Sequence, residues 1–339
     1  MSVRAELAKS FDHRHKCWKG RLRRTLNLGG NSAEMAVYAQ MREDNLRAAE
    51  IYGPGRFWGQ INDTFADFVW AGALENLRTE YFNRRFAGPE PGSRQVWRAL
   101  LWVYYQKLQE IDRDGFLASA SDPREGGNGD QDLIDGRPMS LDFLQSVEEV
   151  YRLREAWALA GRTGQPQLIV ELGAGYGRLA NVCRRMLPDC TYVILDLPEG
   201  LLCSSHWLSR VLSKDCVPYE ESRQMTHFSR EKLLSRKVWT LAAHQIEAIA
   251  DRSVDAFVNI YSFAEMPKGV IDNYFSQLGR VTRGILYSKQ RKHEKNIADG
   301  LDVTASTYPI QSSWKLLFER NTVLYETFFE AAYAIRPPR

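Results

Sequence analysis

The sequence predicts an α/β protein with a mostly parallel sheet, preceded by a helical region. Two observations lead to this prediction. From residue 167 onward, short apolar runs alternate with helical stretches, which is the pattern of βαβ units. The earlier part of the chain instead places apolar and aromatic residues at helical spacing. We therefore divide the chain into an N-terminal helical region, residues 1–138, and an α/β domain, residues 139–339.

The N-terminal region is predicted to contain three helices separated by Pro/Gly breaks. They are expected at residues 32–51, 56–86 and 95–111, with breaks at Pro54-Gly55 and at residues 89–92. We expect this region to cover the substrate side of the α/β domain or to form a homodimer.

The junction between the two regions has its own composition. Residues 121–138 are rich in glycine and acidic side chains, so the segment is predicted to be too polar to pack and to form a mobile loop at the domain boundary. A helix is predicted at residues 139–160, beginning near Ser140 as its N-cap.

Seven strands are expected in the α/β domain. Five should be parallel, at residues 167–172, 192–195, 238–243, 254–261 and 284–288. Two further runs, 314–319 and 328–335, are separated by a short polar segment and predict a closing antiparallel hairpin.

A glycine-rich turn follows the first strand. Residues 171–177 read Glu-Leu-Gly-Ala-Gly-Tyr-Gly, and a helix is expected from Arg178. Gly173, Gly175 and Gly177 allow a sharp turn and a close approach of the backbone to a ligand. The dinucleotide pattern GxGxxG would need glycine at position 178, so the spacing argues against NAD. The pattern ExGxGxG, in a sheet of five parallel strands and a hairpin, instead predicts the Rossmann-like sheet of a class I methyltransferase with S-adenosylmethionine (SAM) as cofactor.

Further cofactor contacts are expected at the ends of the next strands. Asp196 lies 25 residues after Glu171, where a carboxylate can accept two hydrogen bonds from a ribose diol. Gln245 is expected to accept a hydrogen bond from the adenine amino group, and the Ile246 amide to bind a ring nitrogen. Asn259 is expected to face the methionine part of SAM, with a turn-capping role as its alternative. The predicted cofactor residues are Glu171, Gly173, Gly175, Tyr176, Gly177, Asp196, Leu197, Gln245, Ile246 and Asn259.

A hydroxyl acceptor would need a general base, since a protonated hydroxyl is a poor nucleophile. Glu265, just after the fourth strand, is the first candidate, and a helix-capping role is its alternative. His244 is the second candidate, because an unperturbed pKa of about 6.5 suits a base. Lys289 and His293 follow the fifth strand and are weaker candidates. No acidic cluster has convincing metal-ligand spacing, so no metal is predicted.

These motifs resemble a family of sugar O-methyltransferases. The resemblance lies in Glu171-Leu-Gly-Ala-Gly-Tyr-Gly-Arg-Leu179, Asp196-Leu-Pro198, His244-Gln-Ile-Glu247, Ser262-Phe-Ala-Glu-Met266, residues 314–317 with 328–331, residues 143–148 and Phe57-Trp-Gly-Gln-Ile61. It implies methyl transfer from SAM to a hydroxyl of a sugar or of a glycosylated or other small natural product, with S-adenosylhomocysteine as the second product. Ala264 departs from the family, which has a polar residue there, often Gln, so the acceptor stays open.

Composition narrows the protein class. The chain has 44% hydrophobic and 26% charged residues, no apolar run near the ~20 residues of a membrane span, and five cysteines without a CxxC pair. We therefore expect a cytoplasmic protein with reduced thiols and no membrane partner. Residues 1–30 hold eight Lys/Arg and two acidic residues, which we interpret as a solvated basic arm, so no nucleic-acid partner is predicted.

Three other functions stay open. An amino group could be the acceptor, although residues 259–262 lack the prolines that amine-directed enzymes often carry there. The chain could also be a SAM-binding module without turnover. Methylation of RNA would depend on the basic arm.

Overall fold

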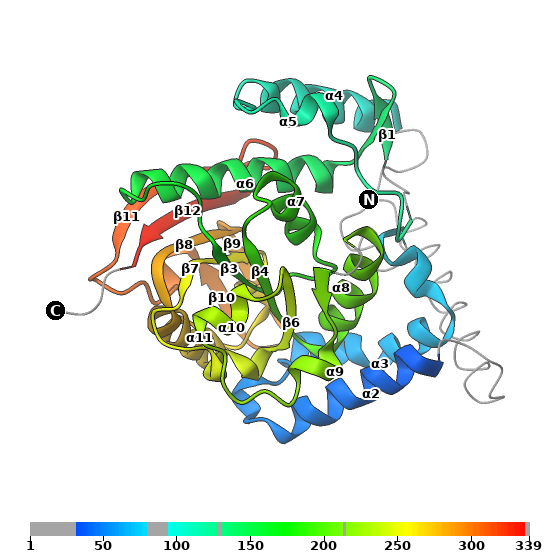
Figure 1. Ribbon diagram of the computed structural model, residues 1–339, viewed down its shortest axis with the longest axis vertical. Helices are drawn as coiled ribbons and strands as arrows, with labels where there is room; N and C mark the ends of the chain where they lie inside the picture. Colours follow the sequence, from blue (N-terminus) through cyan, green and yellow to red (C-terminus); the bar gives the residue numbers. More distant parts are fainter. Residues whose placement is uncertain (1–31, 80–93, 128–130, 213–214, 336–339) are drawn as a thin grey trace.

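The computed structural model describes residues 32–79, 94–127, 131–212 and 215–335 (Figure 1). Its centre is an eight-stranded sheet in the order β11-β12-β8-β7-β3-β4-β6-β5. The strands are β3 (Leu168–Leu172), β4 (Thr191–Asp196), β5 (Cys216–Val217), β6 (Val238–Ala242), β7 (Val254–Ile260), β8 (Thr282–Arg291), β11 (Lys315–Asn321) and β12 (Phe328–Ala334). β12 pairs antiparallel with β8 and β11, and all the other pairs of this sheet are parallel. The predicted mostly parallel, Rossmann-like sheet with its closing hairpin is confirmed, and β5 is an additional edge strand that the sequence analysis lacked.

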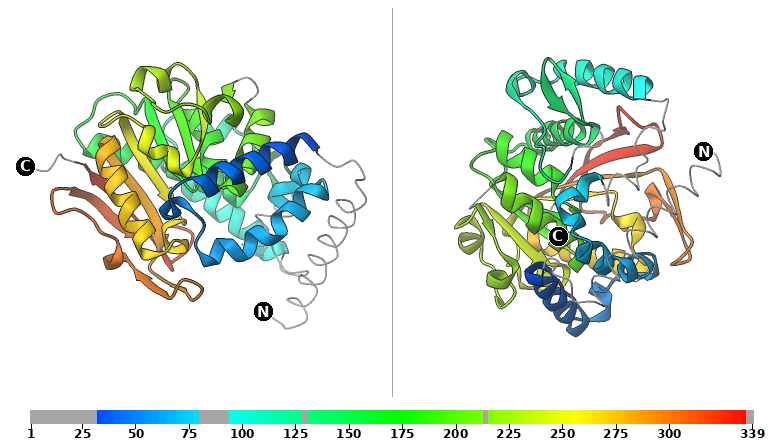
Figure 2. Two further views of the ribbon diagram at one scale, coloured as in Figure 1. Left: turned by 90° about the horizontal axis from the view of Figure 1, so that it is seen from below. Right: turned by 90° about the vertical axis from the view of Figure 1, so that its right-hand side faces the viewer.

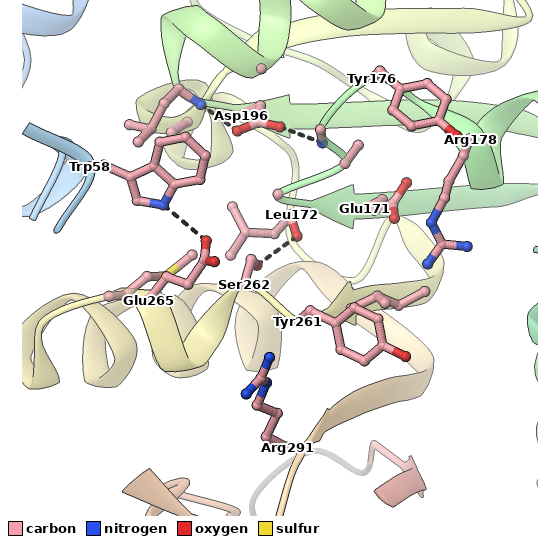
Figure 3. A pocket seen from close by; sticks show the side chains of 18 of the residues that line it. Trp58, Glu171, Leu172, Tyr176, Arg178, Asp196, Tyr261, Ser262, Glu265 and Arg291 are labelled. Atoms are coloured by element: carbon pink, nitrogen blue, oxygen red, sulfur yellow. Dashed lines mark hydrogen bonds between the residues drawn. The ribbon is translucent and has the colours of Figure 1, made fainter. Parts of the chain in front are cut away.

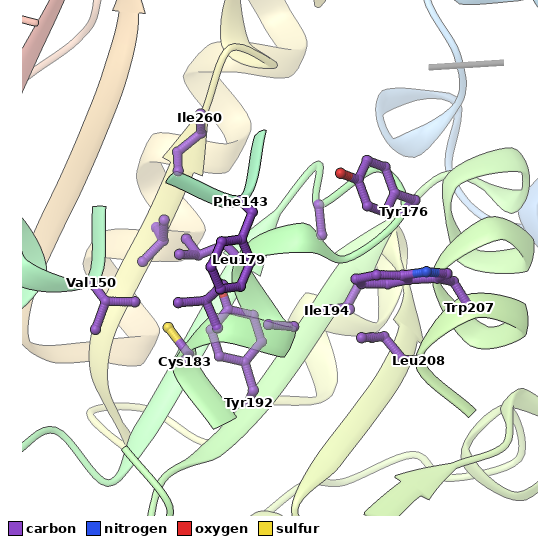
Figure 4. Close-up of a cluster of buried hydrophobic side chains, with 14 of the residues drawn as sticks. Phe143, Val150, Tyr176, Leu179, Cys183, Tyr192, Ile194, Trp207, Leu208 and Ile260 are labelled. Carbon is purple, nitrogen blue, oxygen red and sulfur yellow. The ribbon is translucent and has the colours of Figure 1, made fainter. Parts of the chain in front are cut away.

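The two faces of the sheet bury two hydrophobic cores, because successive side chains of a strand point to opposite faces. In β4, Tyr192 and Ile194 enter one core and Val193 and Leu195 enter the other. The first core is covered by α6 (Leu141–Leu159), α7 (Arg178–Met186) and α8 (Pro198–Val211), and part of it is shown in Figure 4. The second core is covered by α10 (Arg230–Leu234) and α11 (Lys268–Val281). Strands buried on both faces explain the continuous apolar runs of the sequence.

The N-terminal helices pack into the first of these cores. α2 (Ser32–Arg47), α3 (Arg56–Trp70) and α4 (Arg94–Gln109) contribute Tyr38, Phe65 and Leu101 to it. α2 lies along α8 (Figure 2). The Tyr38 hydroxyl of α2 donates to Glu199 Oε1 of α8 at 2.6 Å. The predicted division at residue 138 therefore stays a prediction, since both regions share one buried cluster.

The N-terminal helix boundaries differ from the expected ones. The helix expected at 56–86 ends at Trp70, after which Gly72 adopts φ 72° and a 3-10 turn η2 (Ala73–Asn76) follows. Such a left-handed conformation suits glycine and stops a helix. A 3-10 turn η1 (Glu50–Tyr52) likewise follows α2. The basic arm and the break at 89–92 lie outside the described residues.

The prediction that residues 121–138 are too polar to pack is wrong for the described part of this segment. Asp122 is buried and accepts a hydrogen bond from the Arg78 guanidinium at 2.7 Å, so the two charges compensate each other. The Trp207 indole donates to the Glu125 carbonyl at 2.8 Å. The segment continues into a small hairpin, β1 (Asp132–Ile134) with β2 (Arg137–Met139). The expected N-cap of α6 is confirmed, because Ser140 Oγ accepts from the Phe143 amide.

The remaining elements are short. They are α5 (Phe116–Ser119), α9 (Tyr219–Ser222), the 3-10 turns η5 (Ala243–Ala248), η6 (Phe263–Glu265) and η7 (Ala305–Thr307), and the hairpin β9 (His293–Asn296) with β10 (Leu301–Thr304). Among the described helices, none has the length and apolarity to cross a membrane. The four described cysteines are unpaired.

Candidate active site

A pocket of about 470 Å³ lies at the carboxyl ends of the parallel strands. The chain leaves β3 toward β4 on one side of the sheet and returns through β7 on the other, so the strand order reverses at β3. Open α/β sheets bind ligands at such a switch point. Turns after β3, β4, β6 and β7 line the pocket, together with the end of β8, the turn before β12, and residues from the N-terminal region and α6 (Figure 3).

The glycine turn forms the floor of the pocket. Gly173 and Gly175 adopt φ 77° and 61° and belong to the lining. A Cβ on Gly173 would lie 2.4 Å from Ser262 Oγ, so only glycine permits this close approach of two turns. Gly177, φ 84°, precedes α7 and packs against Leu208 rather than against the pocket. Of the three predicted cofactor glycines in this turn, Gly173 and Gly175 line the pocket, whereas Gly177 packs against the core.

Asp196 lies across the turn from Gly175. Its Oδ2 accepts a hydrogen bond from the Gly175 amide at 2.9 Å, and its Oδ1 accepts one from the Leu197 amide at 2.8 Å. The carboxylate is thereby fixed at the pocket wall, and Leu197 lines the pocket beside it. Burial raises the pKa of Asp196 to about 7, although both amides favour its charged form.

A second carboxylate lies deeper in the same wall. Glu171, the second-last residue of β3, lines the pocket and accepts a hydrogen bond from the Tyr192 hydroxyl at 2.8 Å. Burial raises its pKa to about 7 as well. Tyr176 closes this side: its hydroxyl donates to Asp142 Oδ2 at 2.9 Å, and its ring packs edge-on against Trp207, so it both lines the pocket and belongs to the core.

The structure directs the Gln245 side chain away from the adenine contact expected of it. The Gln245 side chain turns into the protein, where Oε1 accepts from the Ala242 amide at 2.9 Å and Nε2 donates to the Ser222 carbonyl at 3.0 Å. The Ile246 side chain is fully buried in the second core, which does not bear on its backbone amide, so the contact expected of that amide stays a prediction. The turn after β6 folds into η5, which leaves Ala243 as its contribution to the described lining.

Asn259 is also directed inward rather than toward a ligand. Its Nδ2 donates to the Leu172 carbonyl and to Ser262 Oγ, and its Oδ1 accepts from Gln290 Nε2 at 2.6 Å. It is fully buried and lies outside the described lining. Asn259 therefore has the turn-capping role that was the alternative to a methionine contact. It stabilises the turn that carries Tyr261, Ser262 and Glu265.

Glu265 lies in the pocket, at the end of η6. Its Oε2 accepts a hydrogen bond from the Trp58 indole at 3.0 Å (Figure 3). Trp58 is carried by α3, whose first amides, at Arg56 and Phe57, donate to the Asp299 carboxylate of the β9–β10 turn. Asp299 thus caps α3 and orients Trp58 over the pocket.

The other predicted bases lie elsewhere. His244 is absent from the described lining, and burial lowers its pKa. Lys289 is buried and donates to Glu149 Oε1 at 2.9 Å. His293 is exposed and pairs with Asp302. Glu265 is therefore the one of these four candidates that reaches the pocket.

Several lining residues were missed by the sequence analysis. Trp58 belongs to the motif at residues 57–61, which the resemblance included without a role. Tyr261 has φ 61°, an uncommon conformation for a side chain of this size and typical of functional turns. Arg291 and Phe328 join the pocket because β12 pairs with β8 at Phe328 and Arg291. A sequence pattern carries no signal for such a meeting of distant strands.

Within the described ranges, no group of three or more His, Cys, Asp or Glu could hold a metal ion.

Comparisons with known proteins give partial similarities. No family model matches the chain. A segment of 59 residues is 39% identical to the acetylserotonin O-methyltransferase of Bos taurus, and it spans 17% of this chain and 17% of that enzyme. Among solved structures, the magnesium protoporphyrin IX methyltransferase of Synechocystis PCC 6803 with bound SAH aligns with a TM-score of 0.40 at 10% identity, covering 71% of this chain and 99% of that one. The PH0226 protein of Pyrococcus horikoshii OT3 aligns with a TM-score of 0.38 at 9% identity, covering 56% and 91%.

Proposed function

We propose that this chain is a SAM-dependent methyltransferase that methylates a hydroxyl of a sugar or of a glycosylated or other small natural product. One observation carries the proposal. The glycine turn after β3 and the carboxylate of Asp196 after β4 meet in one pocket, at the switch point of a sheet whose closing strand β12 is antiparallel. This combination suits a nucleoside with a ribose diol and an attached charged chain.

The pocket residues fit such a cofactor. Both oxygens of Asp196 are oriented by backbone amides and keep lone pairs that can accept hydrogen bonds from a diol. Gly173 and Gly175 leave backbone next to the ligand space, and Glu171 offers a carboxylate for an ammonium group. When bound, SAM supplies an electrophilic methyl group on its sulfonium. The protein then has to align the acceptor oxygen and remove its proton.

Glu265 is the proposed proton acceptor. It lies on the β7 side of the pocket, and the indole hydrogen bond from Trp58 fixes one carboxylate oxygen. A carboxylate held in this way can take the hydroxyl proton as the oxygen attacks. Such general-base catalysis typically raises the rate by about 10²–10⁴-fold.

The proposal is tested in two steps on the full chain. Isothermal titration should detect binding of S-adenosylhomocysteine and no binding of NAD⁺. Methyl transfer from SAM to a panel of sugars and glycosides is then followed by mass spectrometry, which should reveal a product with one added methyl group. Binding of NAD⁺ instead of S-adenosylhomocysteine would overturn the proposal, and cofactor binding without any product would favour a non-catalytic module.

A further inference from the structure

A cationic side chain enters the pocket from the end of β8. Arg291 is the last residue of that strand and belongs to the pocket lining. Figure 3 shows its guanidinium pointing into the pocket toward Ser262 and Tyr261, on the side away from Asp196. Arg291 therefore lies next to the space proposed for the acceptor and apart from the space proposed for the ribose.

Arg291 has hydrogen-bonding capacity that the neighbouring cations lack. Arg178 also lines the pocket, but its Nη1 and Nη2 donate to Glu149 at 2.6 and 3.1 Å, and Lys289 binds the same carboxylate. The ion pair of Arg291 joins its Nε to Glu294 Oε2 at 3.1 Å, and its side chain is 50% exposed. Within the part of the chain that the structure describes, its two Nη groups make no hydrogen bond. They form a fork of donors suited to a carboxylate or a phosphate.

An aromatic wall holds this guanidinium in place. Its Cζ lies 5.2 Å from the centroid of the Phe328 ring, within the range of a cation–π contact. The Tyr261 ring lies 4.4 Å from Phe328, and the Tyr325 ring lies 5.7 Å from it, measured between ring centroids. All three rings line the pocket. The wall offers apolar surface to the carbon skeleton of a ligand whose charged group meets Arg291.

We infer that the methyl acceptor carries an anionic group, a carboxylate or a phosphate, that Arg291 binds inside the pocket. The inference rests on the proposed function and names the acceptor class for that same site. In a sugar, it corresponds to a sugar acid or a sugar phosphate whose ring lies on the aromatic wall while a hydroxyl faces Glu265.

The test is a titration of the protein saturated with S-adenosylhomocysteine. The probes are D-glucuronate, D-glucose 1-phosphate and uncharged D-glucose. We expect at least one charged probe to bind more tightly than glucose, and Arg291→Gln to weaken that binding by about tenfold or more. Arg291→Lys should retain part of it, since an ammonium keeps the charge but loses the two-pronged geometry. The relative affinity of the two charged probes identifies the preferred anion.

Two variants serve as matched controls. Lys292→Gln removes the same charge from the next residue, which is exposed and lies outside the described lining, so it should leave probe binding within about twofold. Glu294→Gln removes the carboxylate beside Arg291 Nε and should strengthen binding of the charged probe. Equal effects of Arg291→Gln and Lys292→Gln, or equal binding of charged and uncharged probes, would overturn the inference. Failure of the wild-type protein to bind S-adenosylhomocysteine would instead overturn the proposed function.

Discussion

The two halves of the pocket are built in different ways. The half proposed for the cofactor is formed by consecutive turns of adjacent strands, and backbone amides of Gly175 and Leu197 fix its carboxylate. The half proposed for the acceptor gathers Trp58, Arg291 and Phe328 from α3, β8 and β12, which are distant in sequence. The first half depends on local geometry and the second on how separate layers pack. Changes in the N-terminal helices should therefore affect the acceptor half and spare the cofactor half.

Replacing Glu265 with Gln should produce the largest difference between the effect on turnover and the effect on SAM affinity. Turnover should fall by about 10²–10⁴, because the amide cannot take the acceptor proton, while the Kd for SAM stays within about twofold. Single-turnover methyl transfer and calorimetry measure the two quantities. Glu319→Gln, on the exposed face of β11, is the control. Unchanged turnover would remove Glu265 as the base.

The reciprocal change is Asp196→Ala in the cofactor half. SAM affinity should weaken by about 100-fold, since two charge-assisted hydrogen bonds to a diol are lost. The Gly175 and Leu197 amides also lose their acceptor, so the midpoint of chemical denaturation should fall. Calorimetry with S-adenosylhomocysteine and urea titration measure these effects. A loss of affinity of only threefold or less would mean that Asp196 does not hold the cofactor.

Trp58→Phe tests whether the N-terminal region serves the acceptor half alone. The variant keeps an aromatic ring but loses the indole hydrogen bond to Glu265, so kcat should fall by about tenfold. The Kd for SAM should change by less than about twofold. If SAM affinity fell as much as kcat, the proposed separation between the halves would be wrong.

The smallest expected effect is a pH dependence confined to the cofactor half. In the proposed complex the ionised form of Asp196 accepts both diol hydrogen bonds, and burial raises the pKa of this group to about 7. Ligand binding that favours the ionised form must lower this pKa and release a proton, so affinity should rise several-fold from about pH 6 to pH 8. Calorimetry in buffers of different ionisation enthalpy measures the proton release. Asp196→Asn should reduce the slope and leave the part due to Glu171, whose pKa burial also raises to about 7. An unchanged slope in that variant would assign the dependence to another group.

The sequence by itself determined the sheet and much of the cofactor half. Strands buried on both faces leave long apolar runs, and a turn that needs positive φ leaves glycines at fixed spacing, so both features can be read locally. Glu171, Gly173, Gly175, Tyr176, Asp196 and Leu197 were expected near a ligand, and all line the pocket.

Only the tertiary structure decided which side chains turn toward the pocket and which turn away from it. Gln245 lies after a strand and Asn259 lies near the end of one, both in the expected places. The side chains nevertheless form hydrogen bonds with buried backbone groups, because leaving a buried amide or carbonyl unpaired is costly in free energy. Trp58 and Arg291 reach the pocket because α3 is capped by Asp299 and β12 pairs with β8. These contacts join residues that are far apart along the chain, and no local pattern records such a meeting.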